Sequence, residues 1–286
     1  TMTSQQIQRV GVCGSGIMGA GLAEVVARAG VDVVVRSRTL DGAKQMLTTI
    51  EKNLDKQVAK EKMTVEQRNE VLSHIQITDS LQDLAQCDLV IESIIEELAP
   101  KQALFKELDA IVKADAILAT NTSTLAVVKM AQATNRPDKV CGIHFFNPAV
   151  LMPLVEVIRP VTASDSTIER ANEFVALCKK DPVQVLDRAG FIVNALLFPY
   201  LNNAVKMLEA GTANMEDIDT AMKGGCNFPM GPFALLDLVG LDTSVSILDA
   251  LYAEFKDENF VPAKTLRDLL AAGKLGRKTK QGFFSY

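Results

Sequence analysis

The chain contains two histidines, and their surroundings in the sequence differ. His144 ends an apolar run in KVCGIHFFNP and is followed by an aromatic Asn-Pro turn. Side chains at the carboxyl ends of strands border the ligand crevice of an open α/β sheet, where a neutral imidazole could accept the proton of an alcohol. His74, in VLSHIQIT, has no polar motif around it, so we expect a surface or packing histidine there. His144 is therefore the candidate general base.

A catalytic imidazole needs a group that orients its other ring nitrogen. Glu156, in PLVEVIR, lies in an apolar strand pattern, where a carboxylate is costly unless it is paired. We expect it to be that partner, the alternative being a strand residue that points outward. The segment TNTST follows another apolar strand and offers Asn121, Thr122 and Ser123, although it could be a capping turn. Asn194, in GFIVNALL, is either a site residue or a core amide with satisfied hydrogen bonds.

The segment RVGVCGSGIMGAGLAEVVARAG predicts a strand, a tight turn and a helix, with glycines in G-x-G-x-x-G spacing. The first glycine permits the turn, the second lets the backbone approach a pyrophosphate, and the third allows close packing of helix on strand. The helix N-terminus offers its amides and dipole to the phosphates. A plain turn is the alternative, but the second apolar strand that follows favours a dinucleotide site. The residues expected to bind the dinucleotide here are Gly14, Gly16, Ile17, Met18 and Gly19.

The residues after the second strand bear on the choice of cofactor. An acidic residue about 20 positions after the glycines usually binds the adenosine ribose. This chain instead has Arg36, Ser37 and Arg38 there. Arginines cannot accept hydrogen bonds from a ribose diol, but they suit a 2′-phosphate. The sequence therefore favours NADP over NAD, unless both arginines are solvated loop residues.

Up to about Asp187, short β-branched runs alternate with helical patterns, which predicts a doubly wound, mostly parallel Rossmann-type sheet. After Gly190 only helical periodicity remains, with Asn214 as an expected N-cap and about five helices. We therefore expect a dinucleotide-binding domain with the catalytic histidine at residues 1–187 and an all-helical substrate and dimerisation domain at residues 188–286. The strand candidates are Arg9–Cys13, Val31–Val35, Ile75–Thr78, Leu89–Ile91, Ile117–Thr120, Val140–His144, Leu154–Ile158 and Val183–Leu186.

The composition is that of an ordinary globular protein, with 286 residues of which 48% are hydrophobic and 23% charged. A net charge of −5 argues against nucleic-acid binding, which needs a concentrated basic face. The five cysteines are scattered and form no C-x-x-C pair, which predicts reduced thiols in a cytoplasmic protein and no metal site. We expect neither a signal peptide nor a membrane span, since no stretch approaches the ~20 apolar residues that a span needs.

Motifs along nearly the whole chain occur together and in order: GSGIMGAGLAE, LATNTSTL, IHFFNPAVLMPLVEVI, RAGFIVNALLFPYLNNAV, FPMGPFALLDLVGLDT and GRKTKQGFFSY. With them the chain resembles the monofunctional 3-hydroxyacyl-CoA dehydrogenases of fatty acid metabolism, and most closely the bacterial 3-hydroxybutyryl-CoA dehydrogenases. The resemblance implies an oxidoreductase that reversibly converts a (3S)-3-hydroxyacyl thioester into a 3-oxoacyl thioester with NAD(P).

The resemblance also implies roles for the residues singled out above. His144 would be the catalytic base and acid, and Glu156 its carboxylate partner. Ser123 and Asn194 match the family residues that hold the 3-oxygen of the substrate near the histidine. The residues expected beside the cofactor are Glu96 and Lys101, in IIEELAPK, and Asn121. Those expected at the CoA moiety are Asn53, Lys56 and Lys60, for which an ordinary charged helix face is the alternative.

The sequence departs from the family pattern in two places. The Arg36–Arg38 pair replaces the usual Asp, which puts NAD specificity in doubt, and Phe228 stands where close relatives often carry His. The main alternative function is a dehydrogenase that acts on a hydroxyacyl group bound to acyl carrier protein, because both carriers present the same phosphopantetheine thioester. A second alternative is a non-catalytic NAD(P)-binding relative. We also expect a homodimer formed through the helical domain.

Overall fold

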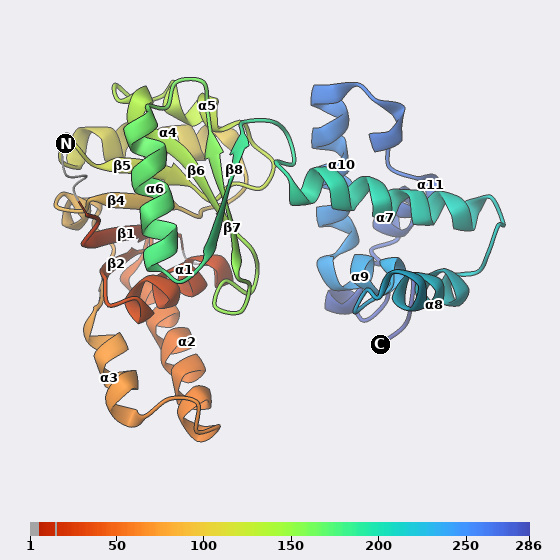
Figure 1. Ribbon diagram of the computed structural model, residues 1–286, viewed down its shortest axis with the longest axis horizontal. Coiled ribbons are helices and arrows are strands. Elements are labelled where there is room, and N and C mark those ends of the chain that lie inside the picture. The colour runs from red at the N-terminus through yellow and green to blue at the C-terminus, as the bar shows by residue number, and fades with distance from the viewer. Residues whose placement is uncertain (1–5, 15) are drawn as a thin grey trace. The chain divides into compact units, whose positions relative to one another are not determined.

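The computed structural model describes residues 6–14 and 16–286. The chain forms two compact units, the first ending at Arg188 and the second running from Ala189 to Tyr286. Figure 1 shows a sheet flanked by helices in the first unit and helices alone in the second. The predicted fold class, a mostly parallel Rossmann-type sheet followed by an all-helical part, is confirmed.

Within the described residues, the first unit contains an eight-stranded sheet with the order β3-β2-β1-β4-β5-β6-β7-β8. Neighbouring strands are parallel except β6 and β7, which pair antiparallel. Each predicted strand exists, and its ends differ from the prediction by at most two residues. The strands are β1 (Arg9–Cys13), β2 (Asp32–Arg36), β3 (Ile75–Thr78), β4 (Leu89–Glu92), β5 (Ile117–Thr120), β6 (Val140–Phe145), β7 (Leu154–Arg159) and β8 (Asp181–Leu186).

The central strands β4, β5 and β6 are buried along their whole length, as expected for a sheet covered on both faces. Figure 1 shows α2 and α3 lying side by side and extending away from the sheet. Local signals start these two helices: the Thr39 hydroxyl accepts from Gly42 N, and Thr64 forms a capping box with Gln67. The α-helices of this unit are α1 (Ile17–Arg28), α2 (Leu40–Ala59), α3 (Val65–Ser73), α4 (Leu98–Ile111), α5 (Val127–Ala131) and α6 (Asp165–Leu177).

Residues 189–286, all of them described, contain five α-helices around a separate apolar core. Asn214 caps one of them by accepting from Asp217 N, as the sequence predicts. The carboxylate of Asp219 accepts from the first amides of another helix, at Phe233 and Ala234. No helix in the described part of the chain is long and apolar enough to cross a membrane. The helices are α7 (Val193–Glu209), α8 (Met215–Cys226), α9 (Pro232–Val239), α10 (Leu241–Phe255) and α11 (Lys264–Ala271).

Candidate active site

His144, on β6, and Glu156, on β7, form a buried pair. They are register partners on the antiparallel strands β6 and β7, so their side chains project from the same face. Nδ1 of His144 lies 2.8 Å from Oε1 of Glu156. The two residues are 4% and 0% exposed, respectively. Glu156 therefore does not point outward into solvent, and its carboxylate can hold the imidazole in one orientation.

The other ring nitrogen of His144 faces Ser123, whose Oγ lies 3.2 Å from Nε2. With Nδ1 hydrogen-bonded to the carboxylate, a neutral imidazole presents Nε2 as an acceptor. The Phe146 ring packs against the imidazole with its centroid 4.7 Å away. A proton acceptor is thus held between a hydroxyl group and a buried carboxylate, which is the arrangement that general acid–base chemistry requires.

The segment after β5 links this pair to the neighbouring strands. The side-chain oxygen of Asn121 accepts from Phe145 N at 2.8 Å, which ties the ends of β5 and β6 together. Thr122 Oγ1 accepts from Leu125 N within the segment, but the first amides of α5, at Val127 and Val128, donate to Asp187, so the segment does not cap that helix. The Glu96 carboxylate accepts from Thr122 Oγ1 at 2.6 Å and from Ser123 N at 2.8 Å. Glu96 therefore fixes the backbone that carries Ser123.

A buried ion pair lies at the end of β4, and it includes a residue that sequence reasoning missed. Lys101 of α4 is 2% exposed, and its Nζ lies 2.5 Å from Oε1 of the fully buried Glu92. The other carboxylate oxygen of Glu92 accepts from Thr120 Oγ1 at 2.7 Å, and Oε1 also accepts from Ile94 N. Lys101 Nζ is also 3.6 Å from Glu96. The available signal was a lone carboxylate ending the apolar run LVIE, which is costly to bury without a partner.

The glycine-rich turn has the geometry that a dinucleotide needs. Gly14 has φ +143°, and a Cβ there would lie 2.2 Å from the Ser93 carbonyl oxygen. A Cβ at Gly19 would lie 2.5 Å from the Gly14 carbonyl oxygen, so both positions require glycine. A Cβ at Gly16 would meet nothing within 4 Å, which leaves open space at the N-terminus of α1. The first turn of that helix carries Ile17 and Met18, and the open space suits a pyrophosphate.

This turn borders a cavity of about 640 Å³ that also includes the two arginines after β2. Arg36 is held locally, since its backbone carbonyl accepts from Gly14 N and its Nε donates to the Asp79 carbonyl at 3.3 Å. Arg38 is exposed at the cavity wall beside Ser37. These residues can hold the adenosine end of a dinucleotide, and the cations favour a phosphate there.

A narrower groove runs along α1, between α2 and the loop after His144. Asn53, Lys56 and Lys60 line it together, as does the loop 147–151. Its floor includes Glu24, whose pKa burial raises above the usual value although Arg28 opposes the shift. The three residues predicted at the CoA moiety are exposed and share one concave surface.

The remaining predicted residues lie elsewhere. Asn194 is a buried residue in the first turn of α7, in the second unit. Phe228, also in that unit, is exposed and contacts the ring of Tyr200 edge-on at 5.9 Å. His74 follows α3, and its Nδ1 lies 2.8 Å from Asp32. Among the described residues, no group of three or more His, Cys, Asp or Glu side chains could hold a metal ion.

The buried cysteines are not candidate nucleophiles. Burial raises the pKa of Cys13, at the end of β1, to about 12, and the nearby charge of Arg36 only partly opposes this. Burial alone raises the pKa of Cys141, on β6, to about 12. Because the thiolate is the reactive form, both thiols are inert near neutral pH.

Comparisons with known proteins identify the family. The sequence profile of the 3-hydroxyacyl-CoA dehydrogenase NAD binding domain matches residues 9–188, and that of the 3-hydroxyacyl-CoA dehydrogenase C-terminal domain matches residues 190–286. A 3-hydroxybutyryl-CoA dehydrogenase of Mycobacterium tuberculosis is 44% identical over 99% of this chain and 100% of its own length. One of Clostridioides difficile is 44% identical over 97% and 99%, respectively.

Solved structures give the same result. The crystal structure of (S)-3-hydroxybutyryl-CoA dehydrogenase from Ralstonia eutropha matches with a TM-score of 0.96 at 39% identity, over 98% of this chain and 99% of that chain. The sequence profiles, the full-length relatives and the matching fold all indicate one enzyme family. This chain therefore belongs to the 3-hydroxyacyl-CoA dehydrogenases, a family of NAD-binding enzymes.

Proposed function

We propose that this enzyme interconverts a (3S)-3-hydroxyacyl-CoA, in particular short-chain 3-hydroxybutyryl-CoA, and the corresponding 3-oxoacyl-CoA, with His144 as general base and acid. The observation that carries the proposal is the buried imidazole, with Nδ1 on Glu156 at 2.8 Å and Nε2 facing Ser123 at 3.2 Å. The names of the full-length bacterial relatives support the short acyl chain.

The side chains of the site divide the acid–base work between them. In the oxidative direction, Nε2 of His144 accepts the proton of the substrate 3-hydroxyl. The Glu156 carboxylate stabilises the imidazolium through Nδ1–H, at a position where solvent does not screen the charge. In the reductive direction, the imidazolium returns the proton to the 3-oxygen. The nicotinamide, when bound, supplies or receives the hydride.

Ser123 and Asn194 are proposed to hold the 3-oxygen of the substrate. For Ser123 the support is its hydroxyl beside Nε2 and the Glu96 carboxylate that fixes its backbone. For Asn194 the support is a buried side chain in the first turn of α7. The groove along α1 is proposed to take the pantetheine arm of CoA, with Asn53, Lys56 and Lys60 at its wall.

We further propose that the enzyme uses NADP in preference to NAD. The support is the cavity that Gly14 and Gly16 share with Arg36 and Arg38, because an arginine guanidinium matches the 2′-phosphate that NAD lacks. Glu96, Lys101 and Asn121 are proposed to line the nicotinamide end. Lys101 Nζ lies 3.6 Å from Glu96, and the Glu96 carboxylate accepts from Thr122 and Ser123, the two residues that follow Asn121, which supports this grouping.

The non-catalytic alternative is set aside, because the chain belongs to a family of enzymes. The carrier-protein alternative shares the reaction and differs only in the group beyond the pantetheine arm. A homodimer is proposed through the second unit, where large apolar side chains such as Met207, Phe228 and Leu238 are exposed. Sedimentation analysis of the purified chain tests this last point.

The function is tested by following nicotinamide absorbance with acetoacetyl-CoA as substrate and NADH and NADPH in parallel. We expect reduction of acetoacetyl-CoA, and faster reduction with NADPH at equal subsaturating concentrations. Acetoacetyl-acyl carrier protein is the comparison substrate. Turnover of that substrate alone, with none of acetoacetyl-CoA, would contradict the proposed CoA specificity.

A further inference from the structure

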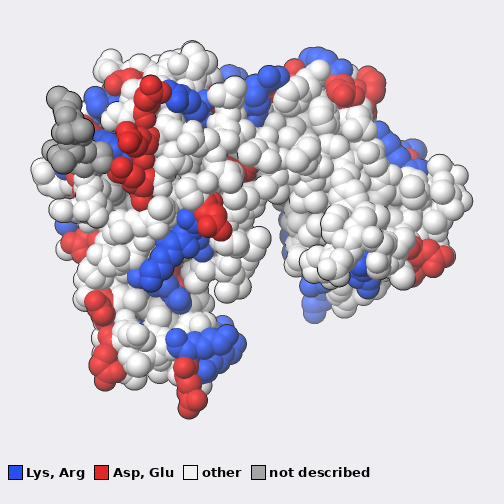
Figure 2. All heavy atoms as spheres, viewed as in Figure 1, with Lys and Arg blue, Asp and Glu red and all other residues white. Residues whose placement is uncertain are grey.

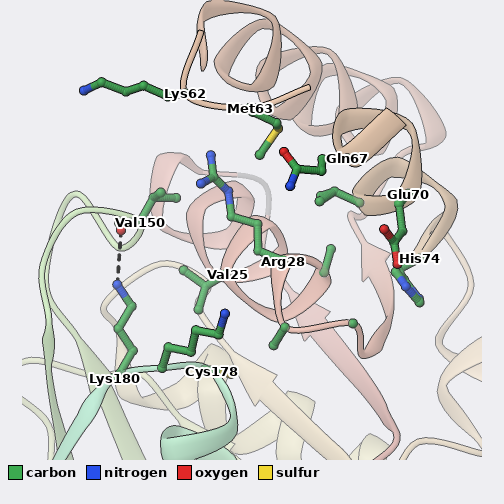
Figure 3. A pocket seen from close by; sticks show the side chains of 15 residues that line it. Val25, Arg28, Lys62, Met63, Gln67, Glu70, His74, Val150, Cys178 and Lys180 are labelled. Carbon is green, nitrogen blue, oxygen red and sulfur yellow. Dashed lines mark hydrogen bonds between the residues drawn. The ribbon is translucent and has the colours of Figure 1, made fainter. Parts of the chain in front are cut away.

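A second hollow of the first unit, which we call the basic pocket, lies at the C-terminal end of α1 and has a volume of about 480 Å³. Its walls come from the end of α1, from residues 62–74 of the α2–α3 turn and α3, from Val150, and from residues 178–180 between α6 and β8. Figure 3 shows the guanidinium of Arg28 projecting into this hollow beside Met63 and Val150. None of the reaction chemistry described above uses it.

The basic pocket concentrates positive charge in a chain whose net charge is −5. Its described lining carries Arg28, Lys62, Lys179 and Lys180, against the single carboxylate of Glu70. Figure 3 shows Glu70 beside His74, on the side of the hollow away from Lys180. Figure 2 shows basic side chains gathered on this face, over the end of α6 and beside α2. A local excess of positive charge in a concave site favours an anionic ligand.

Arg28 and Lys180 both keep hydrogen-bond donors available. One terminal nitrogen of Arg28 lies 2.9 Å from Glu24, and because the guanidinium carries five N–H groups, others at its exposed end remain for a ligand. Nζ of Lys180 donates to the carbonyl oxygens of Val150 and Met152 at 3.2 and 2.9 Å, and an ammonium has a third hydrogen to give. Burial lowers the pKa of Lys180, and the positive charge of Arg28 adds to the effect. An anion between them would relieve this repulsion and accept from both.

The basic pocket continues the groove along α1, since Arg28 and Val150 line both hollows. Five residues of α1 line the groove, and their spacing puts them on one helical face that runs roughly 16 Å from first to last. These residues are Ile17, Ala20, Gly21, Glu24 and Arg28. Asn147, three residues after His144, also lines the groove.

The chemical groups of a CoA thioester follow the same order as the features of this surface. Its acyl group is at one end of an uncharged pantetheine arm, and its diphosphate and 3′-phosphate are at the other. With the acyl group at His144 and the arm in the groove, the phosphates reach the cations at the far end of α1. A carrier protein, in contrast, presents a single phosphodiester attached to a serine and has no 3′-phosphate.

We propose that the basic pocket is a phosphate-binding site in which Arg28 and Lys180 hold the phosphate end of the CoA carrier. This inference rests on the proposed function, because it takes the acyl group to be at His144. It makes the pocket the part of the enzyme that distinguishes CoA from a protein-bound thioester.

The test compares acetoacetyl-CoA with acetoacetyl-N-acetylcysteamine, which has the same reacting group but no phosphate. The variant is Lys180→Met, which keeps an apolar stem. We expect its kcat/KM for acetoacetyl-CoA to fall about 10- to 100-fold through KM, with kcat preserved, because a binding contact distant from the reaction is lost. Its kcat/KM for the truncated thioester is expected to stay within about twofold of the wild type.

Matched variants separate this role from a structural one. Lys52→Met removes the same charge from an exposed position of α2 that lines neither hollow, and it should change neither value. Arg28→Met should act like Lys180→Met, whereas Arg28→Lys keeps the ion pair with Glu24 and should retain most of the affinity. If Arg28→Met does not fold, the Lys180→Met comparison decides the question by itself.

A binding experiment supplies a readout that does not depend on turnover. Adenosine 3′,5′-bisphosphate, titrated by calorimetry, should bind the wild type and bind Lys180→Met about 10-fold or more weakly. Inorganic phosphate is titrated alongside. If phosphate and the bisphosphate bind equally well while KM for acetoacetyl-CoA does not respond to Lys180→Met, the pocket serves free phosphate and the assignment to the carrier is wrong.

The remaining outcomes separate failure of this inference from failure of the proposed function. If the wild type reduces acetoacetyl-CoA but Lys180→Met changes neither KM nor bisphosphate binding, the inference about the pocket is overturned while the proposed function stands. If kcat/KM falls equally for both thioesters, Lys180 acts on the fold of the 147–152 loop and the inference is again overturned. Absence of acetoacetyl-CoA reduction by the wild type would instead contradict the proposed function.

Discussion

His144 and Glu156 occupy paired positions of the antiparallel strands β6 and β7, and their side chains meet with Nδ1 2.8 Å from Oε1. Because the pair is buried, the carboxylate acts on the imidazole with little competition from water. On the other side of the ring, Nε2 faces the Ser123 hydroxyl. The imidazole therefore has one nitrogen for orientation and one for the reaction.

Replacement of His144 by alanine should reduce turnover without removing the cofactor. We expect His144→Ala to lower kcat by at least ~10²-fold, because a positioned general base contributes ~10²–10⁴-fold, and to leave dinucleotide affinity nearly unchanged. Steady-state kinetics and cofactor titration measure the two effects. His74→Ala is the matched control for kcat, since His74 pairs with Asp32 at the wall of the basic pocket and not with the His144–Glu156 pair, and it should retain the wild-type kcat at saturating substrate. Near-normal turnover of His144→Ala would exclude it as the base.

Glu156→Gln should remove the negative charge beside the imidazole and leave the position of the ring unchanged. The amide oxygen can still accept from Nδ1–H, but the negative charge that stabilises the imidazolium is lost. A charged hydrogen bond contributes about 1.5–3 kcal/mol, so we expect kcat to fall about 10- to 100-fold. Steady-state kinetics measure the change, and an unchanged kcat would mean that the carboxylate has no catalytic role.

Loss of one partner of the Glu92–Lys101 pair should destabilise the fold more than loss of both charges. Lys101→Met leaves a fully buried carboxylate without its cation, and we expect a loss of about 3–5 kcal/mol in the free energy of unfolding. Adding Glu92→Gln removes that unpaired charge and should restore most of the loss. Urea unfolding measures both. Lys106→Met, at an exposed position of the same helix, is the control, and Lys101→Met unfolding like this control would refute the prediction.

Arg38 should decide between the two cofactors. We expect Arg38→Ala to raise KM for NADPH about 10- to 100-fold, through the loss of a charged hydrogen bond to phosphate, and to leave KM for NADH nearly unchanged. Arg36 is the weaker candidate, because its Nε already donates to the Asp79 carbonyl. Arg68→Ala, which breaks an ion pair with Asp55 outside this cavity, is the control. Equal effects of Arg38→Ala on both cofactors would argue against a 2′-phosphate contact.

Thiol labelling of the native chain should find one fast-reacting cysteine. Cys226 is exposed, whereas the other four are buried. Burial raises the pKa of Cys87 to about 11 and that of Cys178 to about 12, as it does for Cys13 and Cys141. Since these pKa values lie far above the assay range, raising the pH from neutral to about 9 should not recruit the buried thiols. Cys226→Ser should abolish the fast phase, and a remaining fast phase would show that a buried thiol is accessible.

Much of this architecture is determined locally by the sequence. Continuous apolar runs predict the central strands, because strands covered on both faces need no polar alternation. The glycine spacing predicts the turn, because the Ser93 and Gly14 carbonyls leave no room for a Cβ at Gly14 and Gly19. The presence of only two histidines in the chain made His144 identifiable before any geometry was known.

Only the tertiary structure decided which polar side chains meet. The sequence marks Glu156 as costly to bury, but its contact with His144 depends on the antiparallel register of β6 and β7, which the loop between them sets. Glu92 ends an apolar run in the same way, and its partner Lys101 comes from the following helix. The basic pocket joins side chains from α1, the α2–α3 turn and the α6–β8 turn, and no local pattern connects those segments. Periodicity and propensity act over a few residues, whereas these pairings arise from the packing of distant segments, and that packing makes the candidate site.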